Sequence, residues 1–394
     1  MVMDFARIIP PYSPAAWLDL DALDNNIQST NRKTEKVALR IATKSIRSLD
    51  VLHYIRERTP HYVGLMSYST AESVYLLEQG FDNILCAYPT LDKASIVACV
   101  PYITQGAKMV WMVDHLQHWQ FLQNIAAEQD CILDICLDIN LSLALPKVYF
   151  GTKRSSLHNL KDVQNLIHEC KDFHYTRLVG VMGYEAQIAG LAENIPDKLN
   201  LRTAIRTLKK LSQFELSRKR QKIVKWLQTQ GYDLEIVNGG GSGSMQFTSS
   251  QDEITEITVG SAYYYPALFS YMDTMQTGFQ PASGFVLKVT RHPESQVITC
   301  HSGGFIASGS IGREKQAQIL YPHNLSTLDD EGFGEVQTPM QANGSLNVTI
   351  GDFVWCRHAK AGELCEHFNE LLAYRDSKLV QHMITYRGAG LCFH

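Results

Sequence analysis

The sequence contains no apolar run long enough to cross a bilayer, so no segment is expected to span a membrane. Its 36 basic and 40 acidic residues give a net charge of -4, which favours neither nucleic acid nor an anionic membrane surface as a partner. The nine cysteines, an odd number, follow no framework spacing, which predicts reduced thiols. The first residues, MVMDFARIIPPYSPAAW, contain Asp4, Arg7 and adjacent prolines, so no signal-peptide apolar core is expected there. Together these absences predict a soluble cytoplasmic protein.

What the 394-residue sequence does have is an alternation of short apolar runs with helical patterns. The runs are continuously apolar, as is typical of strands buried on both faces. They are VALRIA (37–42), YVGLMSY (62–68), NILCAY (83–88), KMVWMV (108–113), ILDICLDI (132–139), RLVGVMGY (177–184), LEIVNGG (234–240) and EITVGSAYYY (256–265). Eight runs with helical spacers between residues 25 and 269 predict an α/β fold, a (β/α)8 barrel of the TIM type. A doubly wound sheet is the alternative, because periodicity alone does not separate the two.

The pattern changes after residue 269. Strand-like pieces separated by Gly and Asn turns predict a β-rich C-terminal domain over residues 270–394. These pieces are GFVLKVTRH (284–292), QVITCHSG (296–303), SLNVTIGDFVWCRH (345–358) and KLVQHMITYRG (378–388). The N-terminal segment 1–24 includes the extended stretch AAWLDLDAL, which we expect to pair with the β-rich domain.

Two features at the ends of predicted strands point to chemistry. Lys44 follows the first run, and the carboxyl ends of barrel strands carry the active site in this type of fold. A lysine there can act as a nucleophile toward a carbonyl, although an ordinary surface lysine is the simpler interpretation. The stretch VNGGGSGSMQF (237–247) follows the seventh run, where barrels commonly hold a phosphate on backbone N–H groups; the simpler interpretation is a flexible turn. A reactive lysine and a phosphate loop on one rim together predict pyridoxal phosphate as the cofactor.

Several motifs carry a family resemblance that extends from about residue 14 to 374. They are PAAWLDLDALDNNI, ALRIATKSIRS, GVMGYEAQ, VNGGGSGSMQF, EITVGSAYYY and CRHAKAGELCEHFNEL. The sequence resembles the D-threonine aldolase and D-serine dehydratase group of fold-type III, alanine racemase-like pyridoxal-phosphate enzymes. The resemblance implies that Lys44 carries the cofactor and that Tyr184 lies near it. It also implies cofactor-binding roles for Gly240, Gly241, Ser242, Gly243 and Ser261 at the phosphate and for Arg154 near the ring hydroxyl.

Two positions depart from the pattern of that group. In that group the cofactor lysine is commonly the last residue of a His-Ala-Lys sequence. This chain has Ala42-Thr43-Lys44 instead and so lacks the histidine. After Tyr184 the group usually has a histidine that handles the β-hydroxyl of the substrate, and this chain has Glu185. The second departure puts aldol cleavage in doubt.

A possible metal site follows from the same resemblance. D-specific lyases of the group bind a divalent ion through a short His-x-Asp or His-x-Cys motif, and here His358 is followed by Lys360, which cannot ligate while charged. With an insertion, Cys365 takes the register of the second ligand, and a His/Cys pair suits zinc. Glu363 and His367 are alternative ligands in this loop. The interpretation without a metal makes His358 a polar core residue and Cys365 a small buried hydrophobe.

The resemblance implies a lyase that acts on β-hydroxy D-amino acids by aldol cleavage or dehydration, and it implies a homodimer. A metal-independent amino-acid racemase, with Tyr184 or a tyrosine of a partner subunit as second base, is the alternative enzyme. Two further alternatives are a non-catalytic protein that binds pyridoxal phosphate and a phosphosugar barrel without a cofactor. The β-rich region 270–394 favours an enzyme over the first of these, because the carriers of this barrel type lack such a domain.

Overall fold

The computed structural model describes residues 3–146, 148–305, 307–309 and 312–393, and the contacts divide the chain into two compact units. The barrel unit consists of Asn31–Lys44, Thr59–Gly260 and Phe393–His394, and the sheet unit of Met1–Thr30, Ser45–Arg58 and Ser261–Cys392. The two units therefore interleave along the chain, and one passes into the other directly after Lys44 and directly after Gly260.

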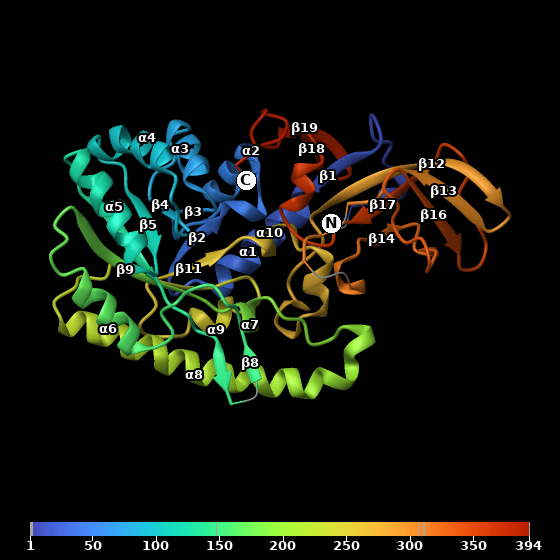
Figure 1. Ribbon diagram of the computed structural model, residues 1–394. Helices are drawn as coiled ribbons and strands as arrows, with labels where there is room; N and C mark the ends of the chain where they lie inside the picture. The colour runs from blue at the N-terminus through green and yellow to red at the C-terminus, as the bar shows by residue number, and fades with distance from the viewer. Residues whose placement is uncertain (1–2, 147, 306, 310–311, 394) are drawn as a thin grey trace. The chain divides into compact units, whose positions relative to one another are not determined.

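Among the described residues, eight parallel strands form a closed barrel in the order β10-β11-β2-β3-β4-β5-β6-β9 (Figure 1). The strands are β2 (Ala38–Ala42), β3 (Tyr62–Ser67), β4 (Ile84–Cys86), β5 (Met109–Val113), β6 (Leu133–Asp138), β9 (Thr176–Tyr184), β10 (Ile236–Gly240) and β11 (Glu256–Val259). Each lies in one of the predicted apolar runs, so the barrel is confirmed over the doubly wound sheet. The second half of the last run instead forms the short helix α10 (Ser261–Tyr264).

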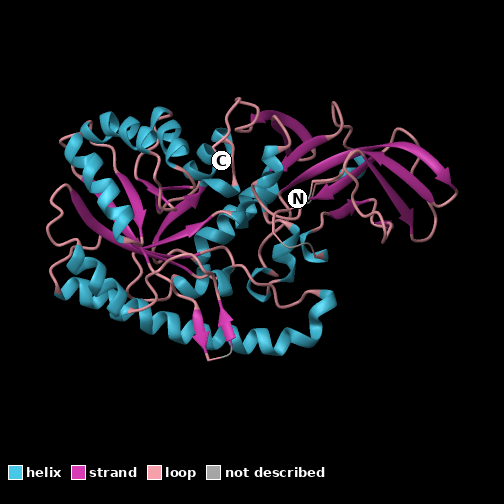
Figure 2. Cartoon of the chain, in the orientation of Figure 1, coloured by secondary structure: helices cyan, strands magenta, loops and turns pink. Residues whose placement is uncertain are grey.

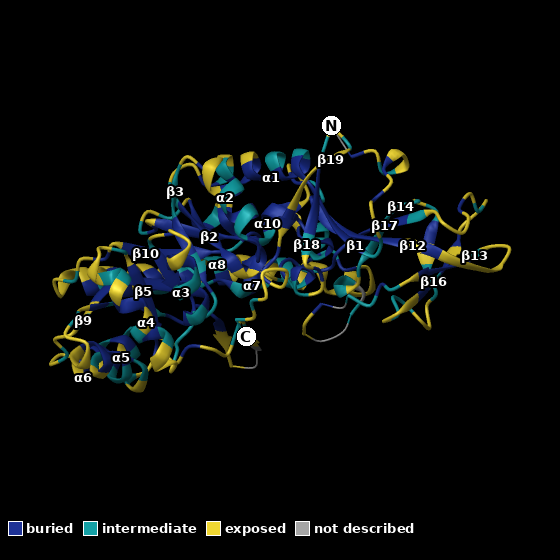
Figure 3. Ribbon diagram, turned by 90° about the horizontal axis from the view of Figure 1, so that it is seen from above, coloured by how far each residue is buried: buried dark blue, intermediate teal, exposed yellow. Residues whose placement is uncertain are grey.

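Helices follow most barrel strands, and Figure 3 shows buried residues on the strands and exposed residues on the outer helices. They are α3 (Thr70–Glu78), α4 (Lys93–Thr104), α5 (Leu116–Glu128), α6 (Leu160–Glu169), α7 (Ala186–Ala189), α8 (Arg202–Thr229) and α9 (Met245–Thr248). Side-chain caps begin several of them: Ser69 accepts from the backbone of Glu72, and Asn159 forms a capping box with Asp162. A short antiparallel hairpin, β7 (Leu143–Leu145) and β8 (Val148–Phe150), follows β6. No helix in the described part of the chain is long and apolar enough to cross a membrane.

The barrel interior is apolar, with one buried polar cluster where the first and last strands meet. Leu85, Val110, Met112 and Cys136 belong to a cluster of buried side chains within the barrel. At the closure between β2 and β11, the buried guanidinium of Arg40 donates to both carboxylate oxygens of Glu256, each over 2.7 Å. A charge pair that is buried and bidentate fixes geometry strongly, because an alternative register would leave a charge unpaired. This pair therefore specifies how the barrel closes.

The sheet unit is built on nine strands that Figure 2 shows in magenta among the described residues. They are β1 (Ala15–Asp19), β12 (Ser283–Glu294), β13 (Val297–His301), β14 (Gln318–Tyr321), β15 (Leu325–Thr327), β16 (Gln337–Ala342), β17 (Phe353–Arg357), β18 (Glu370–Arg375) and β19 (Lys378–Ile384). β1 pairs antiparallel with β12 and parallel with β18, so the N-terminal strand lies inside this sheet. Its Trp17 packs on Trp355 with ring centroids 6.3 Å apart, in the core of the unit.

The helices α1 (Leu20–Lys33) and α2 (Leu49–Glu57) also contribute to the sheet unit, where α1 begins after β1. Asp19 starts α1, because its carboxylate accepts hydrogen bonds from the backbone N–H groups of Asp21 and Ala22. The aromatic residues of YYYPALF fill core positions, since Tyr263 and Tyr264 are fully buried.

Candidate active site at the carboxyl ends of the barrel strands

Three side chains from three barrel strands meet around the amine of Lys44. Lys44 lies in the single 3-10 turn η2 (Thr43–Ser45) directly after β2, where it is exposed at the carboxyl end of the strand. Its Nζ donates to the hydroxyl of Tyr88, which follows β4, over 2.8 Å. The same Nζ lies 5.9 Å from the centroid of the ring of Tyr184, the last residue of β9. Strand ends of a parallel barrel meet on one rim, and this brings together residues that are far apart in the sequence.

Tyr184 also connects the lysine to two other predicted site residues. The guanidinium carbon of Arg154 lies 5.7 Å from the centroid of the Tyr184 ring. A side chain built on Gly241 would place its Cβ 3.5 Å from Cε2 of Tyr184. The structure therefore brings Lys44, Tyr184, Arg154 and the start of the glycine loop into one cluster.

The glycine loop, residues 240–243, owes its composition to close packing. Gly240 has a φ of +85°, a conformation that other residues rarely adopt. A Cβ on Gly243 would lie 2.4 Å from the carbonyl oxygen of Ala189, the last residue of α7. Only glycine lets the loop backbone approach α7 this closely. Ser242, between these glycines, is buried.

Two acids that the sequence analysis did not single out, Tyr88 and Asp138, have shifted pKa values at these strand ends. Burial alone raises the pKa of Tyr88, but the ammonium of Lys44 and then the guanidinium of Arg154 outweigh it, so the pKa is lowered. Asp138 ends β6, and burial together with the neighbouring carboxylate of Asp114 raises its pKa to about 7. Both residues stand at the end of a predicted apolar run, which is the same signal that marks Lys44. That signal could have found them.

Glu185 does not join the cluster around Lys44. It is fully buried, and its carboxylate accepts from Arg220 of α8 over 2.7 Å and from the hydroxyl of Thr248 over 2.6 Å. Arg220 also donates to Glu253. Thr248 is the last residue of α9, which follows the glycine loop. Glu185 therefore links the end of β9 to the elements on either side of that loop.

Ser261 belongs to the sheet unit, where it begins α10 directly after the end of the last barrel strand and Gly260. Its hydroxyl lies 3.1 Å from the hydroxyl of Ser45, and either oxygen can donate. Ser45 follows Lys44 in the sequence. This contact lies between the first residues of two segments of the sheet unit, one beginning after Lys44 and the other after Gly260.

The residues that the sequence analysis pairs as metal ligands do not share a pocket. The ring Nδ1 of His358 lies 2.8 Å from the carbonyl oxygen of Ser283, while its buried Nε2 has no hydrogen-bond partner among the described residues. Burial lowers the pKa of His358 to about 4. The thiol of Cys365 donates to the carbonyl of Ile46 over 3.3 Å, and burial raises its pKa to about 12. Cys365 is thus a protonated buried thiol that already has a partner.

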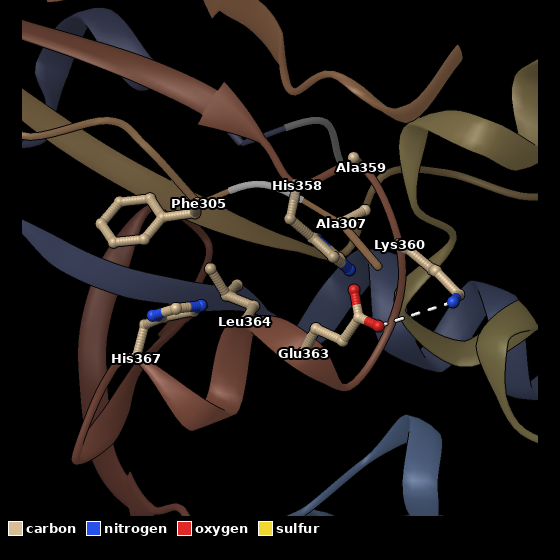
Figure 4. A pocket seen from close by; sticks show the side chains of 8 residues that line it. All are labelled: Phe305, Ala307, His358, Ala359, Lys360, Glu363, Leu364 and His367. Carbon is tan, nitrogen blue, oxygen red and sulfur yellow. Dashed lines mark hydrogen bonds and ion pairs between the residues drawn. The ribbon is translucent and has the colours of Figure 1, made fainter. Parts of the chain in front are cut away.

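The pocket that His358 enters is instead lined by the alternative ligands. Figure 4 shows His358, Lys360, Glu363 and His367 around it, with the Lys360 ammonium beside the Glu363 carboxylate. Glu363 lies in the 3-10 turn η7 (Glu363–Glu366). In the described ranges of the chain, no group of three or more His, Cys, Asp or Glu side chains is arranged to hold a metal ion. The donor set found there does not fit the predicted His358–Cys365 zinc site.

Comparisons with known proteins identify the family. The family described as alanine racemase, N-terminal domain, matches residues 18–267. The 3-hydroxy-D-aspartate aldolase of Paracoccus denitrificans (strain Pd 1222) is 23% identical over 257 residues, which are 65% of this chain and 61% of the aldolase. The chain therefore matches less than two thirds of the length of that curated relative.

Solved structures show the same fold. D-threonine aldolase from Filomicrobium marinum is similar with a TM-score of 0.78 and 16% identity, over 97% of this chain and 96% of the aldolase. D-threo-3-hydroxyaspartate dehydratase from Delftia sp. HT23 has a TM-score of 0.69 and 16% identity, over 95% of this chain and 97% of the dehydratase. The same values describe a metal-free form of a cysteine-to-alanine variant of D-threo-3-hydroxyaspartate dehydratase. Because the family match covers more than half of the sequence, this chain belongs to the family of the alanine racemase N-terminal domain.

Proposed function

We propose that this protein is a pyridoxal-phosphate-dependent lyase that acts on β-hydroxy D-amino acids. The observation that carries the proposal is the position of the Lys44 amine, between the Tyr88 hydroxyl and the Tyr184 ring at the carboxyl end of the barrel strands. The glycine loop beside Tyr184 has only one side chain, that of Ser242, and such an accessible backbone suits a phosphate. The names of the similar proteins, an aldolase of D-threonine, an aldolase of 3-hydroxy-D-aspartate and a dehydratase of D-threo-3-hydroxyaspartate, support the substrate class.

In this proposal the predicted residues keep the roles that the resemblance implies. Lys44 carries the cofactor, Tyr184 and Arg154 border its ring, and the phosphate is held by Gly240, Gly241, Ser242, Gly243 and Ser261. The chemistry that pyridoxal phosphate supplies when bound is the withdrawal of electrons from Cα of the amino acid.

The chain's own groups then handle the protons. For dehydration, the amine of Lys44 would be the base that receives the proton from Cα, whereas aldol cleavage breaks the Cα–Cβ bond and takes its proton from the β-hydroxyl. Tyr88 accepts a hydrogen bond from this amine and so fixes the direction of its lone pair and protons. The lowered pKa of Tyr88 makes its hydroxyl a stronger acid, so it gives up its proton more readily than an ordinary tyrosine. Tyr88 is therefore the positioning group for the catalytic lysine.

A divalent metal at His358 and Cys365 is not part of this proposal, because the Cys365 thiol is bound to Ile46 outside the pocket of His358. The second candidate function is the metal-independent racemase. It is favoured by the position of Lys360, which stands two residues after His358, where the related lyases have a carboxylate or a thiol. The products separate the candidates: a lyase releases glycine and an aldehyde, or an oxo acid and ammonia, whereas a racemase releases the L-enantiomer.

We also propose a cytoplasmic location and a homodimeric assembly. All nine cysteines lie among the described residues, and each is a free thiol, as expected in a reducing compartment. The homodimer follows the family resemblance.

The decisive test of the proposed function is chemical labelling of Lys44. Borohydride reduction of the yellow holoenzyme followed by peptide mapping should attach the cofactor to Lys44, since its amine lies at the strand ends beside the glycine loop. Lys44→Ala should keep the fold and lose turnover by at least about a thousandfold. The matched control is Lys93→Ala, an exposed lysine in α4 that pairs with Glu128. A label on any lysine other than Lys44 overturns the mechanism. A colourless protein that binds no pyridoxal phosphate overturns the cofactor itself.

A further inference from the structure

The pocket of His358 lies within the sheet unit and contains a fixed positive charge. Lys360 follows β17 by three residues, and its Nζ donates to the hydroxyl of Ser308 over 2.7 Å. The same Nζ lies 3.5 Å from Oε1 of Glu363. Figure 4 shows this ion pair at the wall of the pocket into which the His358 ring projects. Lysine is thus held in place by two partners at the edge of the pocket.

Two of the candidate ligands near His358, Glu363 and Cys365, already have partners within the protein. The second carboxylate oxygen of Glu363 accepts from the backbone N–H of Ser308 over 2.9 Å, so both of its oxygens face donors of the protein. Cys365 is directed to the backbone carbonyl of Ile46 and does not line the pocket. Nε2 of His358 and the ring of His367 remain for an incoming ligand, and among the described residues no third His, Cys, Asp or Glu completes a metal site with them. A zinc site in a protein needs three or four ligands, and an ammonium next to it repels the cation.

We propose that the ammonium of Lys360 replaces the divalent metal ion of the related lyases, so that this pocket carries a built-in positive charge and binds no divalent cation. Lys360 stands at the position where the related lyases have their second metal ligand. Glu363, which could itself ligate a metal, is the counterion of Lys360. The unpartnered Nε2 of His358 is then available to hydrogen-bond an uncharged or anionic group and not a metal. The inference about metal binding is independent of the proposed function; only its activity test depends on it.

The main experiment restores a metal ligand at position 360. The full-length protein is purified without chelators, and its metal content is measured by inductively coupled plasma mass spectrometry. It should contain far less than one zinc, manganese or other divalent ion per chain. In calorimetric titration with zinc chloride, Lys360→Asp should bind about one ion per chain, at least about tenfold more tightly than the wild type, because it removes the repelling charge and adds a carboxylate next to His358. Adding His358→Ala to Lys360→Asp should abolish this gain.

The controls address the surroundings and the fold. Lys378→Asp makes the same exchange at an exposed position of β19 in the same unit and should bind zinc no better than the wild type. If Lys360→Asp does not fold, as judged by circular dichroism, Lys360→Cys provides the same test with a thiolate ligand. A stoichiometric divalent ion in the wild-type protein overturns the inference. So does a Lys360→Asp or Lys360→Cys variant that folds and binds zinc no more tightly than the wild type.

The activity test distinguishes failure of this inference from failure of the proposed function. Activity on a β-hydroxy D-amino acid that survives removal of metal by a chelator supports the inference, and activity that is lost and then restored by zinc overturns it. If the protein turns over no such substrate, the proposed function has failed. The zinc titrations then still decide whether Lys360 has replaced the metal.

Discussion

At the scale of single residues, the candidate site follows from which side chains stand at strand ends. Lys44, Tyr88, Asp138 and Tyr184 all end or directly follow a barrel strand. Because these side chains lie on one rim, a nearby opposite charge favours the ionised form of a group, and a nearby like charge disfavours it. The ammonium of Lys44 outweighs burial and lowers the pKa of Tyr88, whereas burial, and then the carboxylate of Asp114, raises the pKa of Asp138.

The raised pKa of Asp138 predicts a pH-dependent stability effect. The carboxyl has a pKa of about 7 in the folded protein against an ordinary value of 3.8, so the folded state binds its proton more tightly. The free energy of unfolding contributed by this group therefore decreases as the pH rises from about 4 to about 7, and stays low above that range. Asp138→Asn removes the cost of ionisation. Its gain in stability over the wild type should be larger at about pH 8 than at about pH 5 in urea unfolding.

The matched control for that measurement is Asp172→Asn, which changes an exposed aspartate of the same unit. Its difference from the wild type should not change with pH. A gain for Asp138→Asn that is equal at both pH values would contradict the assignment of the raised pKa to this carboxyl.

At the scale of elements, one buried network connects the end of β9 with α8 and with α9, which follows the glycine loop. Glu185 at the end of β9 accepts from Arg220 in the middle of α8 and from Thr248 after the loop, and Glu253 binds the other side of Arg220. None of the three ionic side chains is more than one tenth exposed. A buried charge that loses its partner is costly, so these contacts fix the loop more strongly than a surface ion pair could.

Removing Glu185 should therefore disturb both stability and cofactor binding. Glu185→Ala removes the carboxylate that accepts from the buried guanidinium of Arg220, so a buried donor loses its partner. The variant should lower the free energy of unfolding by about 3–5 kcal/mol. Because Glu185 also holds Thr248 behind the glycine loop, pyridoxal phosphate should bind more weakly in an absorbance titration by about tenfold or more.

Glu215→Ala is the control on the same helix, since Glu215 only meets Arg218 at 4.0 Å on the exposed face. It should change the free energy of unfolding by less than about 1 kcal/mol and leave cofactor affinity unaltered. A Glu185→Ala protein that is destabilised but binds the cofactor as well as the wild type would show that the network is structural only. Thr248→Ser, which keeps the hydroxyl, should retain wild-type affinity.

At the scale of the whole molecule, the chain passes between the two units at the residues with proposed roles. The barrel unit ends at Lys44 and again at Gly260, and the sheet unit begins at Ser45 and at Ser261. These two of the five crossings between the units follow the carboxyl ends of the barrel strands β2 and β11.

The proposed assembly is a homodimer. Light scattering at micromolar concentration should return a mass about twice the 44.4 kDa of one chain. The measurement should be made on the holoenzyme and on Lys44→Ala, because assembly should not require the cofactor bond. A mass of one chain in both samples contradicts the dimer.

The sequence by itself determined the barrel and the side chains that stand at its strand ends. A continuously apolar run such as KMVWMV forms a strand that is buried on both faces. This pattern is local, so it can be recognised without information about distant residues. The same holds for the place of Lys44 after β2 and for the glycines before α9, whose conformation and close packing tolerate little else. The four strands predicted beyond residue 269 are also present, in β12, β13, β17 and β19.

Only the tertiary structure decided which partner each polar side chain takes. The sequence placed Glu185 next to Tyr184, but the pairing with Arg220 turns it to a buried position. It placed Cys365 in a ligand register, but the carbonyl of Ile46 binds its thiol, and Lys360 pairs with Glu363. Local patterns encode strands and turns because these depend on neighbouring residues. Hydrogen bonds and ion pairs depend on segments that the fold brings together from distant parts of the chain, so sequence spacing does not specify them.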